Sequence, residues 1–177
     1  ELEVADMENR NVLLKTAVDE FLETSEEHYD YVIIDCPPSL GLLVINAMCA
    51  VHEMLIPIQA EYYALEGLGQ LINTIGLVQE HFNPSLLVST MLITMFDKRT
   101  LLSREVHDEV KNHYPTIVLN TTIPRTVKIS EAPSFNQSVI AYDPKGMGAI
   151  AYCEAALEIA RRSQTVLQAI DARRNEN

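Results

Sequence analysis

The sequence contains no tryptophan and only three cysteines, Cys36, Cys49 and Cys153, which lie far apart. It has no Cys-x-x-Cys pair, so a zinc ribbon and a disulfide framework are both disfavoured. The five histidines are scattered, and we expect no metal site built from soft ligands. Three isolated cysteines fit a protein of a reducing cytosol.

Long hydrophobic runs are also missing. The longest mostly apolar run, residues 40–51, contains Asn46 and is shorter than the ~20 residues that a membrane span needs. The chain does not open with the basic and then apolar segment of a secretory signal. We therefore expect a cytoplasmic protein with no membrane partner.

Basic residues are few, with 13 Lys and Arg against 25 Asp and Glu and a formal net charge of −12. The excess is uneven: residues 1–30 carry ten acidic and two basic residues, whereas residues 98–128 carry six basic and three acidic ones. Net charge argues against nucleic acid as a partner. A local basic face can still bind phosphates, because screening limits electrostatic effects to about 8 Å. From composition alone, a solvated surface of mixed charge is the favoured interpretation.

Apolar spacing predicts that helices and strands alternate along the chain. Helices are expected over residues 9–27, 40–51, 65–82, 101–113 and 148–172, and strands over 31–34, 54–58, 86–93, 117–119 and, as a short extended piece, 139–141. This alternation is typical of an α/β protein with a mostly parallel sheet flanked by helices. Because ligands of such sheets bind at the carboxyl ends of the strands, the residues that follow each strand are the candidates for function.

Asp35 directly follows the buried parallel strand expected at residues 31–34. A carboxylate at such a strand end suits Mg²⁺ bound beside nucleotide phosphates, directly or through water, because Mg²⁺ prefers oxygen ligands. Pro37 and Pro38 cannot join a strand ladder, so the chain must leave the sheet sharply there. Taken alone the pattern is weak, and a turn or helix-capping aspartate is the alternative. Cys36 is expected to be a small packed residue rather than a nucleophile.

Four segments resemble the ParA/Soj family of chromosome and plasmid partitioning ATPases, within the MinD/ParA deviant-Walker P-loop superfamily. They are YVIIDCPPSLG at residues 31–41, IPIQAEYYALEGLGQL at 56–71, TMFDKRTLLSREV at 94–106 and NTTIPRTVKISEAPSFNQSVIAYDPKGMGAIAY at 120–152. They follow the family's order over almost the whole chain, from about residue 29 to residue 160. The resemblance implies a P-loop NTPase-like fold and hydrolysis of ATP with Mg²⁺. It also implies an ATP-dependent homodimer, non-specific binding to double-stranded DNA of the nucleoid, and stimulation by a ParB-type partner.

One part of the family pattern is absent. A P-loop needs Gly-Lys followed by Ser or Thr, so that backbone N–H groups can surround the phosphates. None of the five lysines follows a glycine. We therefore expect a single domain over residues 1–177, with a frayed tail from about residue 173. It would be the C-terminal part of a ParA-like ATPase domain, incomplete at its N-terminus. The isolated chain is expected to hydrolyse ATP poorly or not at all.

The resemblance assigns the nucleotide site by position. Asp35 is the expected catalytic residue. It is also expected to bind Mg²⁺ through a water molecule. The adenine end of ATP is expected on loops that follow later strands, at Met95, Pro124, Arg125 and Pro144. Away from the resemblance, each of these is an ordinary loop residue.

The resemblance also assigns DNA contacts, to Arg125, Lys128 and Lys145. These side chains suit phosphate binding, which is driven by charge and reads no sequence. A solvated lysine is the alternative for each. Met147 stands where relatives often carry another base, so we expect modest and strongly salt-dependent binding.

Two further function classes stay open. The chain could be a non-catalytic, ParA-like interaction or regulatory module. Less favoured is a MinD-like membrane-associated regulator, because Glu154, Glu158 and Asp171 dilute the basic face of the terminal helix. An iron–sulfur reductase of the same superfamily is disfavoured, since the three cysteines do not match its bridging pattern.

Overall fold

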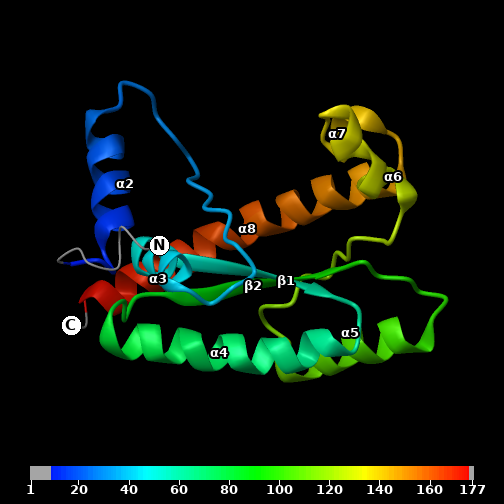
Figure 1. Cartoon of the computed structure of the whole chain (residues 1–177), viewed down its shortest axis with the longest axis horizontal. Helices are drawn as coiled ribbons and strands as arrows, with labels where there is room; N and C mark the ends of the chain where they lie inside the picture. Colours follow the sequence, from blue (N-terminus) through cyan, green and yellow to red (C-terminus); the bar gives the residue numbers. More distant parts are fainter. Residues whose placement is uncertain (1–8, 176–177) are drawn as a thin grey trace. The chain divides into compact units, whose positions relative to one another are not determined.

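The structure, a computed structural model, describes residues 9–175, and their side chains as far as residue 163. Figure 1 shows the helices and strands in chain order. The chain divides into two compact units. Unit 1 comprises Glu1–Met54 and Gln70–Leu87, and unit 2 comprises Leu55–Gly69 and Val88–Asn177. The division passes through a strand and a helix, β1 (Glu53–Gln59) and α4 (Tyr63–His81). The single domain expected over the whole chain stays a prediction.

Helices α2 (Leu13–Thr24) and α3 (Leu42–Ala50) lie in unit 1, as their apolar spacing predicts. Asn46 connects them. Its buried amide donates to the carbonyl of Arg10 at 2.6 Å and accepts from the backbone N–H of Leu14 at 3.5 Å. Because a buried amide must find hydrogen-bond partners, this polar residue in an apolar run fixes the start of α2 against α3.

Asn83 joins the end of α3 to the segment that follows α4. Its side-chain amide donates to the carbonyls of Met48 and Val51, each at 2.8 Å, and its oxygen accepts from the Ser85 hydroxyl at 2.8 Å. The last carbonyls of a helix have no partner within the helix. One buried amide therefore satisfies two carbonyls at this helix end.

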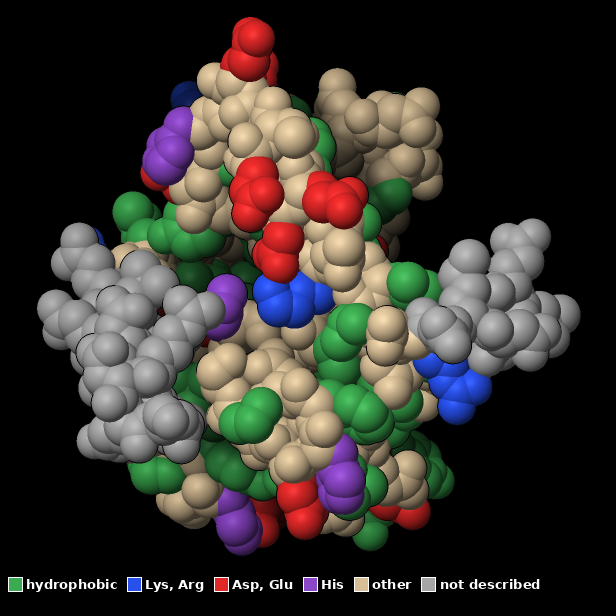
Figure 2. Space-filling view, turned by 90° about the vertical axis from the view of Figure 1, so that its left-hand side faces the viewer, with side chains coloured by type: hydrophobic (Ala, Val, Ile, Leu, Met, Phe, Trp, Pro, Cys, Tyr) green, Lys and Arg blue, Asp and Glu red, His purple; other side chains and the backbone are tan. Residues whose placement is uncertain are grey.

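The outer surface of α2 is incompletely covered. No side chain of α2 is buried, and Phe21 is 54% exposed while its ring lies 5.6 Å from that of Tyr29. Figure 2 shows several separate acidic side chains on the face in view, with hydrophobic side chains also reaching that surface. The apolar stripe that predicts this helix therefore does not predict full burial.

Strand β2 (Leu87–Thr94) is paired on both edges. On one edge it forms a parallel two-stranded sheet with β1, and on the other it makes the parallel bridge Met91–Val118. A second parallel bridge, Phe96–Pro124, lies just beyond its end. Its residues from Ser89 to Ile93 are all buried, which is typical of a central parallel strand. The prediction of an α/β fold with a parallel sheet and flanking helices is confirmed.

Hydroxyl side chains cap the helices that follow β2 in unit 2. They accept the backbone N–H three residues on, at Thr100 for α5 (Leu101–His113), Thr126 for α6 (Val127–Glu131) and Ser138 for α7 (Val139–Tyr142). A short 3₁₀ helix, η1 (Ala132–Phe135), separates α6 from α7. The long helix α8 (Met147–Asn175) ends the described chain. N-terminal capping by Ser or Thr satisfies N–H groups that a helix cannot pair itself.

The buried strand predicted at residues 31–34 is not formed. The segment is extended but belongs to no strand, and Ile33 is 89% exposed. A parallel strand is stable only where a neighbouring strand pairs with its backbone. Among the described residues, β1 and β2 pair with each other and neither pairs with this segment.

Two other strand predictions are corrected. Residues 117–119 contribute a single bridge, at Val118, rather than a strand. Residues 139–141 lie in α7 and are not extended, because the Ser138 side chain accepts from the Ala141 N–H and starts a helical turn. Local capping has outweighed the β-propensity of Val139 and Ile140 there.

Small side chains let α8 approach the sheet closely. Ala151 and Ala155 are buried in one cluster with Leu92, Leu119 and Ile123. No helix in the described part of the chain is long and apolar enough to cross a membrane.

Glu158 and Arg162, one turn apart on α8, hold the segment between residues 116 and 121. The Glu158 carboxylate accepts the backbone N–H groups of Asn120 at 2.9 Å and Thr121 at 3.0 Å. Arg162 donates to Glu158 at 2.6 Å and to the carbonyl of Val118 at 3.2 Å. The two side chains are only 18% and 27% exposed, so these charge-assisted bonds are little screened by solvent.

We expect Glu158→Gln to lower the free energy of unfolding at neutral pH by about 1–3 kcal/mol, because an amide cannot accept both N–H groups as well as a carboxylate does. Burial alone would raise the pKa of Glu158, but the N–H donors of Asn120 and Thr121 and the Arg162 guanidinium outweigh it and lower the pKa. The carboxylate therefore stabilises the fold above its unfolded-state pKa of about 4.3, and this contribution is lost as pH falls through the lower folded-state pKa. Urea unfolding across this pH range measures it. A wild-type advantage that stays constant down to the lowest pH would contradict the assignment.

A second stability prediction concerns Gly148, near the start of α8. A Cβ there would lie 2.8 Å from Ile129 Cγ1 and 3.4 Å from Val139 Cγ2. We expect Gly148→Ala to destabilise the chain by about 1–3 kcal/mol through overpacking. Gly76→Ala is the matched control, because a Cβ there meets nothing within 4 Å. This control should gain up to about 1 kcal/mol of helix propensity. Equal melting temperatures for the two variants would show that the close packing at Gly148 is unimportant.

Candidate functional site

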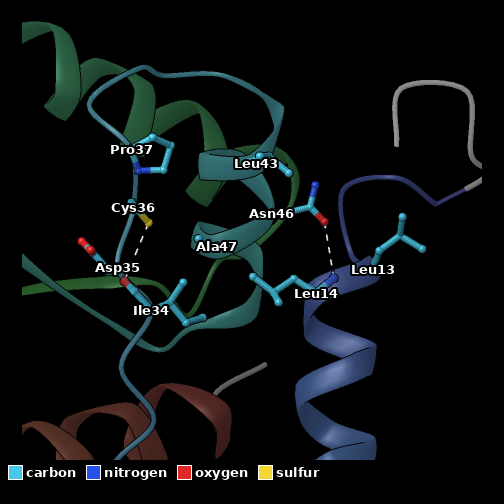
Figure 3. Close-up of a pocket in the computed structure, with 9 residues that line it drawn as sticks. All are labelled: Leu13, Leu14, Ile34, Asp35, Cys36, Pro37, Leu43, Asn46 and Ala47. Carbon is cyan, nitrogen blue, oxygen red and sulfur yellow. Dashed lines mark hydrogen bonds between the residues drawn. The ribbon is translucent and has the colours of Figure 1, made fainter. Parts of the chain in front are cut away.

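The candidate residues fall into both units. Asp35 lies in unit 1, whereas the others lie in unit 2: Met95, Pro124, Arg125, Lys128, Pro144 and Lys145. Asp35 is exposed and sits in the extended segment that precedes Pro37 and Pro38. In Figure 3 its carboxylate points away from Leu13 and Leu14. The carboxylate is therefore open to solvent rather than enclosed by apolar side chains.

A pocket of about 440 Å³ lies beside Asp35 in unit 1. Its walls come from the start of α2, the loop around Asp35 and the first half of α3: Leu13, Leu14, Ile34, Asp35, Cys36, Pro37, Leu43, Asn46 and Ala47 (Figure 3). Most of these are apolar, and the buried Asn46 is engaged by backbone groups. The pocket itself therefore offers little to a phosphate. Cys36 is exposed, so the prediction that it is packed is wrong. Partial loss of solvent around its thiol, and then the nearby Asp35 charge, raise the pKa of Cys36, which disfavours a role as nucleophile.

Asp35 fits Mg²⁺ as one ligand among several. Among the described residues, no three His, Cys, Asp or Glu side chains form a group that could hold a metal ion by themselves. Mg²⁺ in nucleotide sites is commonly bound by one or two carboxylates together with water and phosphate oxygens. The single Asp35 carboxylate suits that arrangement. None of the six glycines is followed by lysine, so the chain itself supplies no P-loop.

In unit 2 the backbone brings two of the predicted nucleotide loops together. The Phe96 N–H donates to the Ile123 carbonyl at 3.0 Å, and the Arg125 N–H donates to the Phe96 carbonyl at 3.0 Å. Met95 and Pro124 therefore lie on adjacent chain segments, as the strand-end argument predicts. Met95 has φ 54°, a left-handed conformation that is uncommon for a residue with a side chain. Such strained residues cluster at functional sites, and this one lies at the end of β2.

Arg125 is placed between acidic groups. Its guanidinium lies 3.6 Å from the Glu61 carboxylate, and the side chains are 60% and 48% exposed. The side chain and backbone N–H of Arg99, and more weakly the charge of Arg125, lower the pKa of Asp97 to about 2. Glu61 is thus the carboxylate at ion-pairing distance from Arg125, whereas Asp97 is engaged by Arg99.

Lys128 belongs to a polar cluster formed by α6, η1 and α7. Its ammonium donates to Glu131 at 3.0 Å and lies 5.3 Å from the centroid of the Tyr142 ring. The Tyr142 hydroxyl donates to the same carboxylate oxygen of Glu131 at 3.3 Å, and Phe135 stacks on Tyr142 at 5.0 Å. The hydrogen bond and charge of Lys128 lower the pKa of Glu131, and Glu131 in turn raises the pKa of Lys128.

Pro144 and Lys145 directly follow α7 and are both exposed. The Gly146 N–H donates to the Asp143 carbonyl at 2.9 Å and closes a turn around them. A Cβ at Gly146 would lie 2.0 Å from the Asp143 carboxylate, so a larger residue there would displace the Asp143 side chain. Lys128 and the turn that follows α7 lie in the same unit as Met95 and Pro124.

The sequence reasoning did not identify Glu131 or Tyr142 as partners of Lys128. The spacing of Lys128 and Glu131, three residues apart, is a signal for ion pairing on a helix. The approach of Glu61 to Arg125 depends on tertiary structure and leaves no local pattern in the sequence. Asn46 was visible only as a polar exception within an apolar helix.

The chain is similar to curated proteins over most of its length. It is 50% identical over 160 residues to the sporulation initiation inhibitor protein Soj of Bacillus subtilis, covering 90% of this chain and 62% of that protein. It is 44% identical over 162 residues to the chromosome partitioning protein ParA of Myxococcus xanthus, covering 92% of this chain and 56% of that protein. The chain therefore spans about 60% of the length of these relatives.

Solved structures agree with these sequence relationships. Cobyrinic acid a,c-diamide synthase from Mycobacterium smegmatis, with bound ADP and magnesium, superposes with a TM-score of 0.73 at 36% identity. The match covers 93% of this chain and 58% of that one. A second structure of that synthase holds an ATP analogue and magnesium. The ligands of these structures agree with the prediction of ATP and Mg²⁺ as cofactors.

A family described as an AAA domain matches residues 1–88. This match includes Asp35 and the first two of the four segments that carry the resemblance, and the Soj and ParA similarity continues beyond them. The fold is that of P-loop NTPases. The sequence is therefore strongly homologous to the Soj and ParA chromosome-partitioning proteins, of whose length it spans about 60%.

Proposed function

We propose that this chain is part of a ParA-type ATP hydrolase that works in chromosome or plasmid partitioning. The observation that carries the proposal is the 50% identity to Soj over 160 residues. The match covers 90% of this chain, in which the candidate residues Asp35, Met95, Pro124 and Lys145 lie. This chain spans only 62% of the length of that relative. We therefore propose ATP hydrolysis for a whole protein of the relatives' length and not for this chain alone.

In this proposal Asp35 orients the attacking water and binds Mg²⁺ through a second water molecule. Its exposed carboxylate, directed away from the apolar side chains beside it, is free to accept hydrogen bonds from water. Mg²⁺, when bound, supplies positive charge to the phosphate oxygens. A carboxylate with these neighbours acts through position and charge, which carry most of the catalysis in phosphoryl transfer.

Met95, Pro124, Arg125 and Pro144 form the proposed adenine end of the site. The thioether of Met95 and the ring of Pro124 offer apolar surfaces on segments that backbone hydrogen bonds hold side by side. Such surfaces suit the faces of a purine, while backbone groups of the same loops can pair with its edge. Pro144 would shape the opposite rim.

Arg125, Lys128 and Lys145 form the proposed DNA surface of unit 2. All three side chains are exposed, and phosphate binding requires only accessible positive charge. A few bases give weak binding, so a homodimer formed on ATP binding would strengthen it by presenting the surface twice. A ParB-type partner would then stimulate hydrolysis and release from the nucleoid.

A non-catalytic interaction module is the second candidate function. It is favoured by the absence of a Gly-Lys pair from this sequence and by the exposed, unpaired conformation around Ile33. A protein that keeps only these elements could bind the partners of a partition ATPase without turning over ATP.

Titration calorimetry with Mg²⁺ and ATP distinguishes the two candidates. We expect this chain to bind ATP weakly or not at all, and a version extended to the length of its relatives to bind and hydrolyse it. In the extended version, Asp35→Asn should lower turnover by at least about 100-fold. Asp30→Asn is the matched control, because Asp30 lies in the same segment with its side chain 83% exposed.

Other outcomes would revise the proposal. Equal ATP binding by the short and extended versions would mean that the phosphates are held by residues of this chain. An extended version that binds partners but does not hydrolyse ATP would favour the interaction module. Equal loss of turnover in both Asp variants would remove the special role of Asp35.

A further inference from the structure

The basic residues of unit 2 that the DNA proposal uses are not free cations. Arg125 pairs with Glu61 at 3.6 Å, and Lys128 pairs with Glu131 at 3.0 Å. Beside them, Arg99 pairs with Asp97 at 2.7 Å. Lys145 differs, because no carboxylate within the described residues lies at ion-pairing distance from it.

The two pairs come from different parts of unit 2. Glu61 precedes α4 and reaches Arg125, which is 64 positions later in the numbering. Glu131 ends α6 and reaches back to Lys128 in the same helix. Two independent elements thus place a carboxylate on a proposed phosphate contact.

Glu131 is held in its position by more than Lys128. Its Oε2 also accepts the Tyr142 hydroxyl, and the Tyr142 ring is fixed by stacking on Phe135. The same ring lies beneath the Lys128 ammonium. The carboxylate and the ring together keep the ammonium close to negative charge, so an incoming anion meets a neutralised lysine.

We propose that Glu61 and Glu131 are affinity-determining residues that mask Arg125 and Lys128 from DNA phosphates. The inference rests on the proposed DNA binding. It adds that a DNA phosphate must displace a carboxylate from each of the two basic side chains, Arg125 and Lys128. All four side chains are 41–60% exposed, so each pair can open without unfolding its surroundings. Exposed ion pairs are weak, and each mask should therefore reduce DNA affinity by only about two- to fivefold.

The test compares binding of a short, mixed-sequence DNA duplex by fluorescence anisotropy over a range of salt concentrations. We expect Glu131→Gln and Glu61→Gln each to tighten binding about two- to fivefold, and the double variant to combine both gains. Each unmasked cation should also steepen the slope of log K against log salt by up to about 0.9. A merely structural role for the glutamates would not produce this change of slope.

Two controls separate local masking from other effects. Glu105→Gln changes the net charge by the same amount on the exposed surface of α5 and should leave binding almost unchanged. Glu131→Asp keeps the negative charge and should behave like the wild type. Thermal unfolding of each variant confirms that it is folded.

The outcomes distinguish the inference from the function on which it rests. If Lys128→Ala weakens binding but Glu131→Gln and Glu61→Gln do not tighten it, masking is wrong and DNA binding stands. Weaker binding by Glu131→Gln would make Glu131 a residue that positions Lys128, which also overturns masking. If neither the wild type nor the double variant binds DNA at low salt, both proposals fail.

Discussion

The need of β2 to pair its backbone on both edges governs the arrangement of unit 2. A buried strand cannot leave its N–H and C=O groups without partners. β2 satisfies them through β1 on one side and through the backbone groups of Ile117, Leu119 and Ile123 on the other. This pairing brings the end of β2 beside the loop that carries Pro124 and Arg125. The proximity of Met95 to that loop is therefore a consequence of sheet pairing, and it requires no contact between their side chains.

The same requirement explains why the apolar segment before Asp35 is not a strand. In a parallel strand, alternate residues direct their backbone groups to the same neighbour. The backbone groups of His52 and Ala60, at even positions, form hydrogen bonds toward β2. By this alternation Pro57, at an odd position, directs its backbone to the opposite edge of β1. That edge lacks one N–H donor because proline has none. The β-branched residues around Ile33 favour a strand conformation. Among the described residues, however, no strand pairs with this segment.

Sequence patterns predicted the features that depend on local periodicity. They failed for features that depend on contacts between residues far apart in the sequence. Helix α5 has the predicted bounds, because its apolar spacing and its Thr100 cap are local. The backbone segments that carry Met95 and Pro124 lie side by side, while their place in a common nucleotide site stays a prediction. By contrast, the contact of Glu158 with Asn120 joins residues 38 positions apart and leaves no sequence pattern. The Glu61–Arg125 pair was missed for the same reason, and the short helix α7 because a single cap outweighed two β-branched residues.

Carboxylate–base pairs in unit 2 are of two physical kinds. The Glu158–Arg162 pair is mostly buried, and its members also bond to backbone groups, so opening it would leave charged groups and N–H donors unsatisfied. The Glu131–Lys128 and Glu61–Arg125 pairs are about half exposed, and water can replace either partner at little cost. Only the second kind leaves its base available to an incoming phosphate. Burial, more than the residue types involved, therefore decides which charges of unit 2 hold its fold and which can exchange partners.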